Sequence, residues 1–344
     1  MSNGYGDDQP ISSLGEHELL QRLQRYCPAH LVGDDAAVLP VSGDHRLVVT
    51  ADMLIDGVHF SIGLANPDLV TTSLEDVGWR AAAVNLSDLA AMGATPLGIT
   101  VSLGLPPTVP VGWLDQLYAG MSACLSRYQT PILGGDLCRS STFTVSISAL
   151  GEVAPDRQVL RAAAQVGDAI LCTGVHGASR AGLELLRNPA WGADLAPEVR
   201  DRLKQAHQRP IPRLDVPPLL WAIDPSVRVA GMDSSDGLAD AVVQICRASG
   251  VGARLHRDRL PMPVAFHQTQ DLSEVEGINW VLYGGEDFEL VLCLPLAIAE
   301  CLVEQIDGAA LIGVITADPT VVLEHPKGSV PPEIIDLQKG FQHF

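Results

Sequence analysis

Six times along this 344-residue chain, an apolar segment runs into a short Gly-, Ser- or Ala-rich stretch that carries an acidic residue. The six stretches are Gly33-Asp34-Asp35-Ala36-Ala37, Thr50-Ala51-Asp52, Asn85-Leu86-Ser87-Asp88-Leu89, Gly134-Gly135-Asp136, Asp233-Ser234-Ser235-Asp236-Gly237 and Gly284-Gly285-Glu286-Asp287. We interpret each as a turn at which a buried strand or helix ends. The repetition predicts a fold in which acidic turns, far apart in the sequence, converge on one cleft.

Carboxylates gathered in one place repel each other and resist ionisation, and a hard divalent cation such as Mg²⁺ removes that cost. Glycine beside each acidic residue lets a metal ion or a phosphate approach the backbone closely. The competing interpretation is that these are ordinary turns and helix caps, with Asp236-Gly237 as the start of a helix. The pattern recurs in a chain with only 18% charged residues, which favours a metal–phosphate site.

The usual nucleotide-binding signatures are absent from the sequence. The chain has no GxxxxGK[ST] loop, no GxGxxG motif and no kinase HRD or DFG set. Its lysines are Lys204, Lys327 and Lys339, and none stands in a phosphate-binding loop. If the chain uses ATP, we expect metal ions to hold the phosphates.

The composition excludes some classes of partner. A formal net charge of −19 makes the chain a poor general binder of nucleic acid or of anionic membranes. Seven cysteines without a CxxC pair are typical of reduced thiols in a cytosolic protein. The first ten residues carry no apolar stretch of signal-peptide length, and we expect residues 1–13 to be disordered. These features predict a cytoplasmic protein.

Hydrophobic periodicity predicts alternating helices and strands in two domains. The expected helices cover residues 16–27, 68–92, 113–127, 178–187, 197–207 and 237–249, and the expected strands cover 46–51, 97–105, 131–133, 142–153, 169–173, 228–232, 288–294, 309–315 and 320–323. The sequence turns polar around residues 155–167, so we place a boundary there, between domains 14–155 and 156–344. Without strict βαβ alternation, we expect an α+β or mixed α/β fold in two layers.

The order and spacing of the motifs resemble the thiamine-monophosphate kinase family. The resemblance adds Asp52-Met53-Leu54-Ile55-Asp56-Gly57-Val58-His59-Phe60 and Lys339-Gly340-Phe341 to the acidic stretches, and it runs from about residue 14 to the C-terminus. It places the chain in the aminoimidazole ribonucleotide synthetase-like superfamily. This implies an N-terminal α/β domain that dimerises through its sheet, and a C-terminal α+β domain. ATP and several Mg²⁺ ions are expected in the cleft between them.

The resemblance also implies roles for individual residues. The implied metal ligands are Asp35, Thr50, Ala51, Asp52, Asp88, Asp136, Asp233 and Asp236. The implied ATP contacts are Tyr118, Gly135, Asp136, Arg161 and Ser235, and the implied acceptor contacts are His59, Glu286 and Phe341. Taken alone, His59 is a surface histidine and Phe341 a packing residue. The family often has Ser-Thr-Asp where this chain has Thr50-Ala51-Asp52, so at Ala51 only the backbone carbonyl is left as a ligand.

The activity implied by the resemblance is transfer of the γ-phosphoryl group of ATP to thiamine monophosphate, giving thiamine diphosphate. The acceptor phosphate is already anionic, so the chemistry needs no covalent intermediate and little general-base help. Two alternatives stay open: another ATP-dependent enzyme of the superfamily with a different acceptor, and a non-catalytic nucleotide- or metal-binding protein. The presence of His59 and the Gly284-Gly285-Glu286-Asp287 motif favours the kinase.

Overall fold

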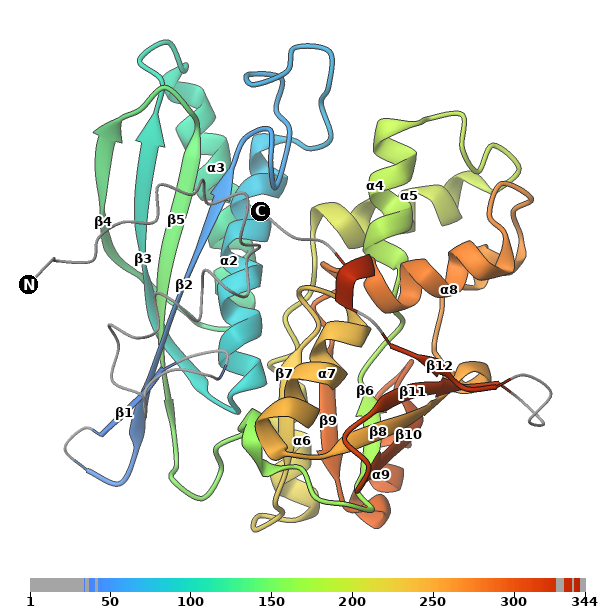
Figure 1. Cartoon of the computed structure of the whole chain (residues 1–344). Coiled ribbons are helices and arrows are strands. Elements are labelled where there is room, and N and C mark those ends of the chain that lie inside the picture. Colours follow the sequence, from blue (N-terminus) through green and yellow to red (C-terminus); the bar gives the residue numbers. More distant parts are fainter. Residues whose placement is uncertain (1–33, 35–36, 41–42, 326–330, 336, 341–344) are drawn as a thin grey trace, which may run out of the picture.

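The computed structural model describes residues 34, 37–40, 43–325, 331–335 and 337–340, which build two β-sheets and the helices around them (Figure 1). The predicted helix over 16–27, the predicted disorder of 1–13, and the predicted site residues Asp35 and Phe341 lie outside the described residues. Among the described residues, no helix has the length and apolar character that crossing a membrane requires.

The first half of the chain forms a five-stranded sheet with one face covered by two helices. The strand order is β1 (Ala37–Pro40), β2 (Arg46–Ile55), β5 (Thr144–Val153), β3 (Thr95–Leu105) and β4 (Ile132–Arg139). The helices are α2 (Leu74–Ala91) and α3 (Val111–Arg127). All neighbours pair antiparallel except β3 and β4, which are parallel. Residues of β5 alternate between buried and half-buried, so one face of the sheet packs on the helices and the other is open.

The second half forms a seven-stranded, largely antiparallel sheet. Its order is β12 (Glu333–Ile334), β11 (Val321–Glu324), β8 (Gly252–His256), β10 (Ala310–Thr316), β6 (Ala169–Cys172), β9 (Leu290–Leu294) and β7 (Ala230–Asp233). Around it lie α4 (Ala178–Arg187), α5 (Pro197–Gln208), α6 (Val216–Ile223), α7 (Leu238–Ser249), α8 (Glu274–Tyr283) and α9 (Leu296–Val303), with short 3₁₀ turns η2 (Arg161–Ala163), η3 (Arg257–Arg259), η4 (Val264–His267) and η6 (Leu337–Lys339). Two layers with mainly antiparallel sheets confirm the expected fold class.

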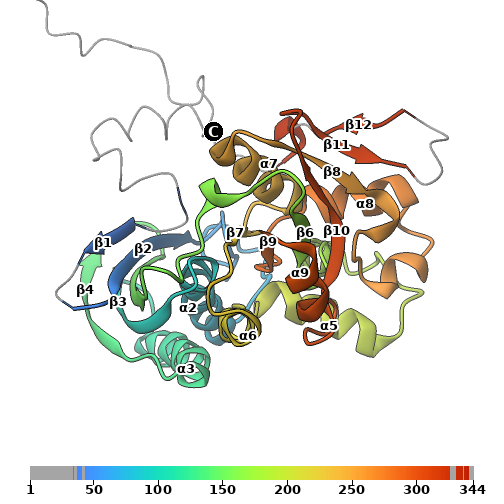
Figure 2. The same cartoon turned by 90° about the horizontal axis from the view of Figure 1, so that it is seen from below.

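Helix α2 is buried between the two halves (Figure 2). Its middle, with Ala81, Ala82 and Ala83, packs in the core of the first sheet. Its last turn, with Ala90 and Ala91, packs in a core shared with β6, β9, α6 and α9. A helix that is apolar on all sides must be covered on all sides, and small side chains let both halves approach its backbone. The two halves are therefore packed around one helix.

The segment after α5 ties the second half to α2 and α3. The Trp79 indole donates to the Pro210 carbonyl at 2.8 Å, and the Tyr128 hydroxyl donates to the Pro212 carbonyl at 3.2 Å. Arg209 forms ion pairs with Asp76 and Glu75 in the first turn of α2. These contacts fix the segment after α5 against α2 and the end of α3.

Most predicted elements are confirmed, with shifted ends. The sequence did not predict β1, β8, β12, α6, α8 or α9. The predicted helix over 68–92 ends correctly, but its predicted start at residue 68 is wrong. Helix α2 begins at Leu74, and its N-cap is Ser73, whose hydroxyl oxygen accepts from the Asp76 amide at 3.1 Å.

Three of the six acidic stretches are not turns. Asp52 lies inside β2, Asp88 lies inside α2, and Asp136 lies inside β4. The glycines of the Gly134-Gly135-Asp136 stretch suggested a turn, but Gly135 serves strand packing: a methyl group placed on it would lie 1.8 Å from the Val101 carbonyl oxygen. These carboxylates are therefore held by regular elements and not by loops.

We predict that Gly120→Ala destabilises the protein by about 1–3 kcal/mol or more, because α2 and α3 touch at their glycines. A methyl group on Gly120 would lie 1.7 Å from the Glu75 carbonyl oxygen, and one on Gly78 would lie 1.8 Å from the Leu117 carbonyl oxygen. Urea unfolding followed by circular dichroism measures the change.

The matched control is Gly112→Ala in the first turn of the same helix, where a methyl group meets nothing within 4 Å. It should leave the free energy of unfolding unchanged or raise it, because alanine favours helix. Equal stability of the two variants would contradict close packing of α2 on α3.

Candidate active site

Two short hydrogen bonds join three elements at the C-terminal end of α2. The Thr50 hydroxyl of β2 donates to Asp88 Oδ2 at 2.5 Å, and the Ser87 hydroxyl of α2 donates to Asp233 Oδ2 at 2.6 Å. Ser87 and Asp233 are 0% and 1% exposed. One bond lies within the first half, and the other crosses to the second half. Acidic residues from distant parts of the chain therefore meet at one place.

The acidic pair at this place is Asp52 and Asp233. The Asp52 amide donates to Asn85 Oδ1 at 3.1 Å, which fixes this point of β2 against α2. Burial raises the pKa of both carboxyls, and the charge on Asp52 raises that of Asp233 further. Hydrogen bonds from Ser87 and Ser235, and the charge of Arg161, act in the opposite direction on the pKa of Asp233. A buried carboxyl whose ionisation is suppressed further by a neighbouring carboxylate suits a divalent cation.

Among the described residues, no three His, Cys, Asp or Glu side chains lie close enough together to form a metal site by themselves. Asp35, the remaining predicted ligand of the N-terminal motif, is outside that set. Its neighbour Asp34 accepts a hydrogen bond from the Arg161 amide at 2.7 Å. The described part of that motif thus lies beside Arg161, at the same site.

Arg161 is the basic residue of the acidic cluster. It begins η2, and Ser249 holds that turn: the Ser249 hydroxyl donates to the Arg161 carbonyl at 2.7 Å and accepts from the Ala164 amide at 3.0 Å. Arg161 lies close enough to Asp233 to lower its pKa. A guanidinium among carboxylates suits a phosphate group.

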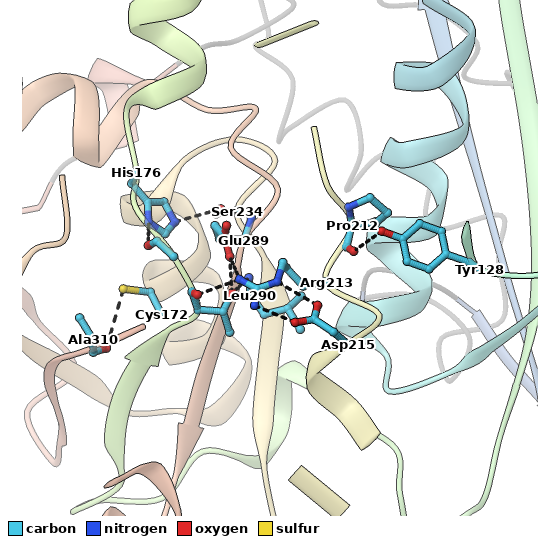
Figure 3. A network of polar contacts seen from close by, with 12 residues as sticks. Tyr128, Cys172, His176, Pro212, Arg213, Asp215, Ser234, Glu289, Leu290 and Ala310 are labelled. Carbon is cyan, nitrogen blue, oxygen red and sulfur yellow. Dashed lines mark hydrogen bonds and ion pairs between the residues drawn. The ribbon is translucent and has the colours of Figure 1, made fainter. Parts of the chain in front are cut away.

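A buried network holds the Asp233–Gly237 turn at Ser234 (Figure 3). The Ser234 hydroxyl lies 3.0 Å from His176 Nε2 and accepts from the Glu289 amide at 3.2 Å. His176 Nδ1 lies 3.1 Å from the Gly174 carbonyl, so Nδ1 carries the proton and Nε2 accepts from Ser234. Burial lowers the pKa of His176 to about 4, and the ring is neutral at pH 7. The turn is thereby held rigid.

In the same network Arg213 pairs with Glu289 and Asp215, and the neighbouring Pro212 carbonyl accepts a hydrogen bond from Tyr128 of the first half (Figure 3). Within the Asp233–Gly237 turn, Ser235 is half-buried and Asp236 is exposed. Asp236-Gly237 does stand at the start of a helix, as the competing interpretation had it, but the N-cap of α7 is Gly237 and no side chain caps the helix. Asp236 therefore lies at the surface, next to Ser235.

A second group of residues lies beside the N-terminal half of α2. His59 Nδ1 accepts from the Ile55 amide at 3.1 Å, which leaves Nε2 as the protonated nitrogen of a neutral ring. The Asp56 carboxylate fixes the same loop by accepting from the Ile62 and Ala65 amides. Glu286 pairs with Arg80 of α2 and lies 3.5 Å from His207 Nδ1. Sequence analysis missed Arg80 and Ser87, although a lone arginine in an Ala-rich helix and a serine before Asp88 were visible signals.

Asp136 does not join this cluster within one chain. Its register partner on β3 is Ser102, which pairs with Ser146 of β5, and that row continues to Met53 of β2. Asp52 belongs to the next row, so the two carboxylates point to opposite faces of the sheet. Asp136 therefore lies on the open face, away from α2.

Two more predicted binding positions have side chains outside the acidic cluster. Ala51 is exposed on the open face, and its predicted role rests on the backbone carbonyl alone. Tyr118 of α3 is half-buried against the core of the first sheet. Their roles in binding stay predictions.

Comparison with known proteins gives a consistent picture. Two family models match, AIR synthase related protein, N-terminal domain, at residues 33–153 and AIR synthase related protein, C-terminal domain, at residues 165–325. A thiamine-monophosphate kinase of Synechococcus elongatus is 50% identical over 341 residues, or 98% of each chain. One of Prochlorococcus marinus is 33% identical over 340 residues, or 97% of each chain. The solved structure "AaThiL complexed with AMPPCP and TMP" matches with a TM-score of 0.81 at 28% identity, covering 98% of this chain and 100% of that one.

We predict that Ser87→Ala weakens divalent-metal binding by about 10- to 100-fold, because the hydroxyl orients the Asp233 carboxylate. Loss of this hydrogen bond also raises the pKa of Asp233, which further lowers its affinity for a cation. Mn²⁺ titration followed by electron paramagnetic resonance at pH 7.5 measures the change. Ser126→Ala on the exposed face of α3 is the matched control. If folded Ser87→Ala binds Mn²⁺ with unchanged affinity, Asp233 is not part of the metal site.

Proposed function

The chain belongs to the thiamine-monophosphate kinase family, and we propose that it transfers the γ-phosphoryl group of ATP to thiamine monophosphate. The observation that carries this proposal is the acidic cluster at the end of α2, where Thr50–Asp88 and Ser87–Asp233 contacts join both halves. Relatives across nearly the whole chain carry the same activity in their names. A matching solved structure holds a nucleotide analogue and TMP.

The cluster fits Mg²⁺, and we assign Asp52, Asp88 and Asp233 to hold it, with Asp35, Asp236 and the oxygens of Thr50 and Ala51 completing the set. The fit rests on Asp233, a buried carboxyl whose pKa is raised by burial and by Asp52. When bound, Mg²⁺ neutralises phosphate charge so that two anions can meet. Arg161 adds a fixed positive charge beside the same carboxylates. We assign Ser235, Gly135, Asp136 and Tyr118 to ATP binding.

We place the acceptor near the other end of α2, against His59, Glu286 and Phe341. Burial raises the pKa of Glu286, but the charge and the hydrogen bond of Arg80 outweigh burial and hold that pKa below its usual range, so the side chain is ionised at neutral pH. An ionised carboxylate suits the cationic thiazolium ring and the amino group of thiamine. Since the acceptor oxygen is itself anionic, the transfer needs no general base and no covalent intermediate, and the assigned residues act by orienting the two substrates.

We further propose a cytoplasmic homodimer that forms through the open face of the first sheet. The open face is the side of the sheet on which the side chains of Ala51, Met53, Ser102, Ser146 and Asp136 lie. Met53 is 51% exposed on this face. Strand β4 is an exposed edge from Leu133 to Arg139, and such edges are usually covered. Asp52 and Asp136 are three strand spacings apart, roughly 14 Å, so one chain does not bring them to one ion. In this proposal Asp136 serves the site of the second copy.

We also propose that the two halves are separate domains, at residues 14–155 and 156–344. The family models support a boundary between residues 153 and 165.

The described cysteines are all free thiols, in keeping with a reducing compartment.

The first test measures ADP formation with purified protein, ATP and Mg²⁺. We expect release that depends on thiamine monophosphate, that free thiamine does not support, and that EDTA abolishes. Asp233→Asn should lower turnover by roughly 10²–10³-fold, because a preorganised charge is lost. ADP release with a different acceptor would point to another superfamily activity. Nucleotide binding without any turnover would point to a non-catalytic protein.

A second test asks whether Asp136 acts across the dimer. Asp136→Asn and Asp88→Asn are each expected to be nearly inactive alone. Co-expressed, they should regain about a quarter of wild-type activity, since half of the dimers are mixed and each mixed dimer has one intact site. Co-expression of Asp88→Asn with Asp233→Asn is the control and should regain nothing. No recovery in the first mixture would place Asp136 in its own chain's site or outside any site.

A further inference from the structure

Arg80 is a buried cation in the Ala-rich middle of α2. The residue is 4% exposed, between Trp79 and Ala81. A buried charge costs several kcal/mol unless it is paired and hydrogen-bonded. Packing alone does not require an arginine in the interior of this helix. The residues that pair with Arg80 therefore indicate its role.

Both partners of Arg80 belong to the second half of the chain. Its Nη2 donates to Glu286 Oε1 in an ion pair. Its Nη1 donates to the His207 carbonyl at 3.0 Å and lies 3.2 Å from His207 Nε2. Burial and the charge of Arg80 lower the pKa of His207 to about 3, so that ring is neutral and does not compete for the Glu286 charge. Arg80 is therefore the closest full positive charge to Glu286 among the described residues.

The backbone at Glu286 is strained and needs support. Glu286 has φ of 61°, in the left-handed region that non-glycine residues rarely adopt, directly after Gly285 at 65°. Its amide donates to the Ser235 carbonyl at 2.6 Å, which ties this loop to the Asp233–Gly237 turn. A strained backbone persists only where the surroundings fix it. Arg80 fixes the side-chain end of Glu286, as Ser235 fixes the backbone end.

The Glu286 side chain is not fully enclosed. It is 34% exposed, whereas the Arg80 side chain is 5% exposed. Arg80 thus holds the Glu286 side chain from within, while part of that side chain faces outward. A buried pair that only fastened the two halves would not need an open side.

We propose that Arg80 is a positioning residue that fixes the Glu286 carboxylate for recognition of the cationic, amino-bearing acceptor. This inference rests on the proposed function, in which Glu286 contacts thiamine monophosphate. Arg80 does not touch the substrate. It determines where the carboxylate stands and keeps it charged.

The alternative is that the pair only holds the two halves together. That role is already served by Arg209, which pairs with Asp76 and Glu75 on the first turn of α2, and by the Trp79–Pro210 hydrogen bond. Arg209 is therefore the matched control: Arg209→Met removes an ion pair between the same helix and the same half without touching Glu286.

The experiment measures KM for each substrate and kcat in the full-length protein, for Arg80→Met, Arg80→Lys, Glu286→Gln and Arg209→Met. We expect Arg80→Met to raise KM for thiamine monophosphate at least about tenfold, with KM for ATP and kcat within about threefold. Arg80→Lys should recover part of the loss, because it keeps the charge without the guanidinium fork. Arg209→Met should lower the melting temperature and leave both KM values near wild type.

A double-mutant cycle separates positioning from folding. Arg80→Met added to Glu286→Gln should raise KM for thiamine monophosphate no further, since the partner is already lost. Additive effects, or an equal rise of both KM values, would overturn the proposal. If Arg80→Met does not fold, the same cycle with Arg80→Lys decides by the same criterion. Failure of the wild-type protein to use thiamine monophosphate would refute the proposed function instead, and the two failures are distinct.

Discussion

The structure depends on the burial of α2 between two sheets. Fifteen residues of this 18-residue helix are buried, among them polar Arg80, Asn85 and Ser87. Each buried polar group must find a partner, and those partners come from both halves. The helix therefore does more than fill space: its few polar side chains decide how the second half is oriented against the first.

The spacing along α2 separates two kinds of recognition. Arg80 and Ser87 are seven residues apart, nearly two turns, so both face the second half, where they meet Glu286 and Asp233. Seven residues of helix span about 10 Å. Asn85 and Asp88 face β2 instead and contact Asp52 and Thr50. One helix thus sets the separation between the acidic cluster assigned to the metal and the carboxylate assigned to the acceptor.

Sequence analysis identified the chemistry better than the geometry. The acidic motifs, the two-layer fold and most elements were predictable from residue type and periodicity. The sequence did not predict that Asp52, Asp88 and Asp136 lie inside regular elements. Glycine and aspartate beside an apolar run look alike in a turn and in a tightly packed strand. The side of the sheet on which Asp136 lies depends on strand register, which needs the partner strands. Arg80 was missed because its partners are remote in sequence.

The charge balance of the cleft explains why cations are needed from outside. The buried histidines His176 and His207 are neutral, with pKa values lowered by burial, so they act as hydrogen-bonding scaffold and bring no positive charge. The positive charge of Arg80 is balanced by Glu286. Arg161 lies among carboxylates whose pKa values are raised by burial. A site that is acidic before a polyanion enters can bind that polyanion only with added positive charge. The acidity that makes the chain a poor binder of nucleic acid is, at this point, what makes it suited to a metal-bound nucleotide.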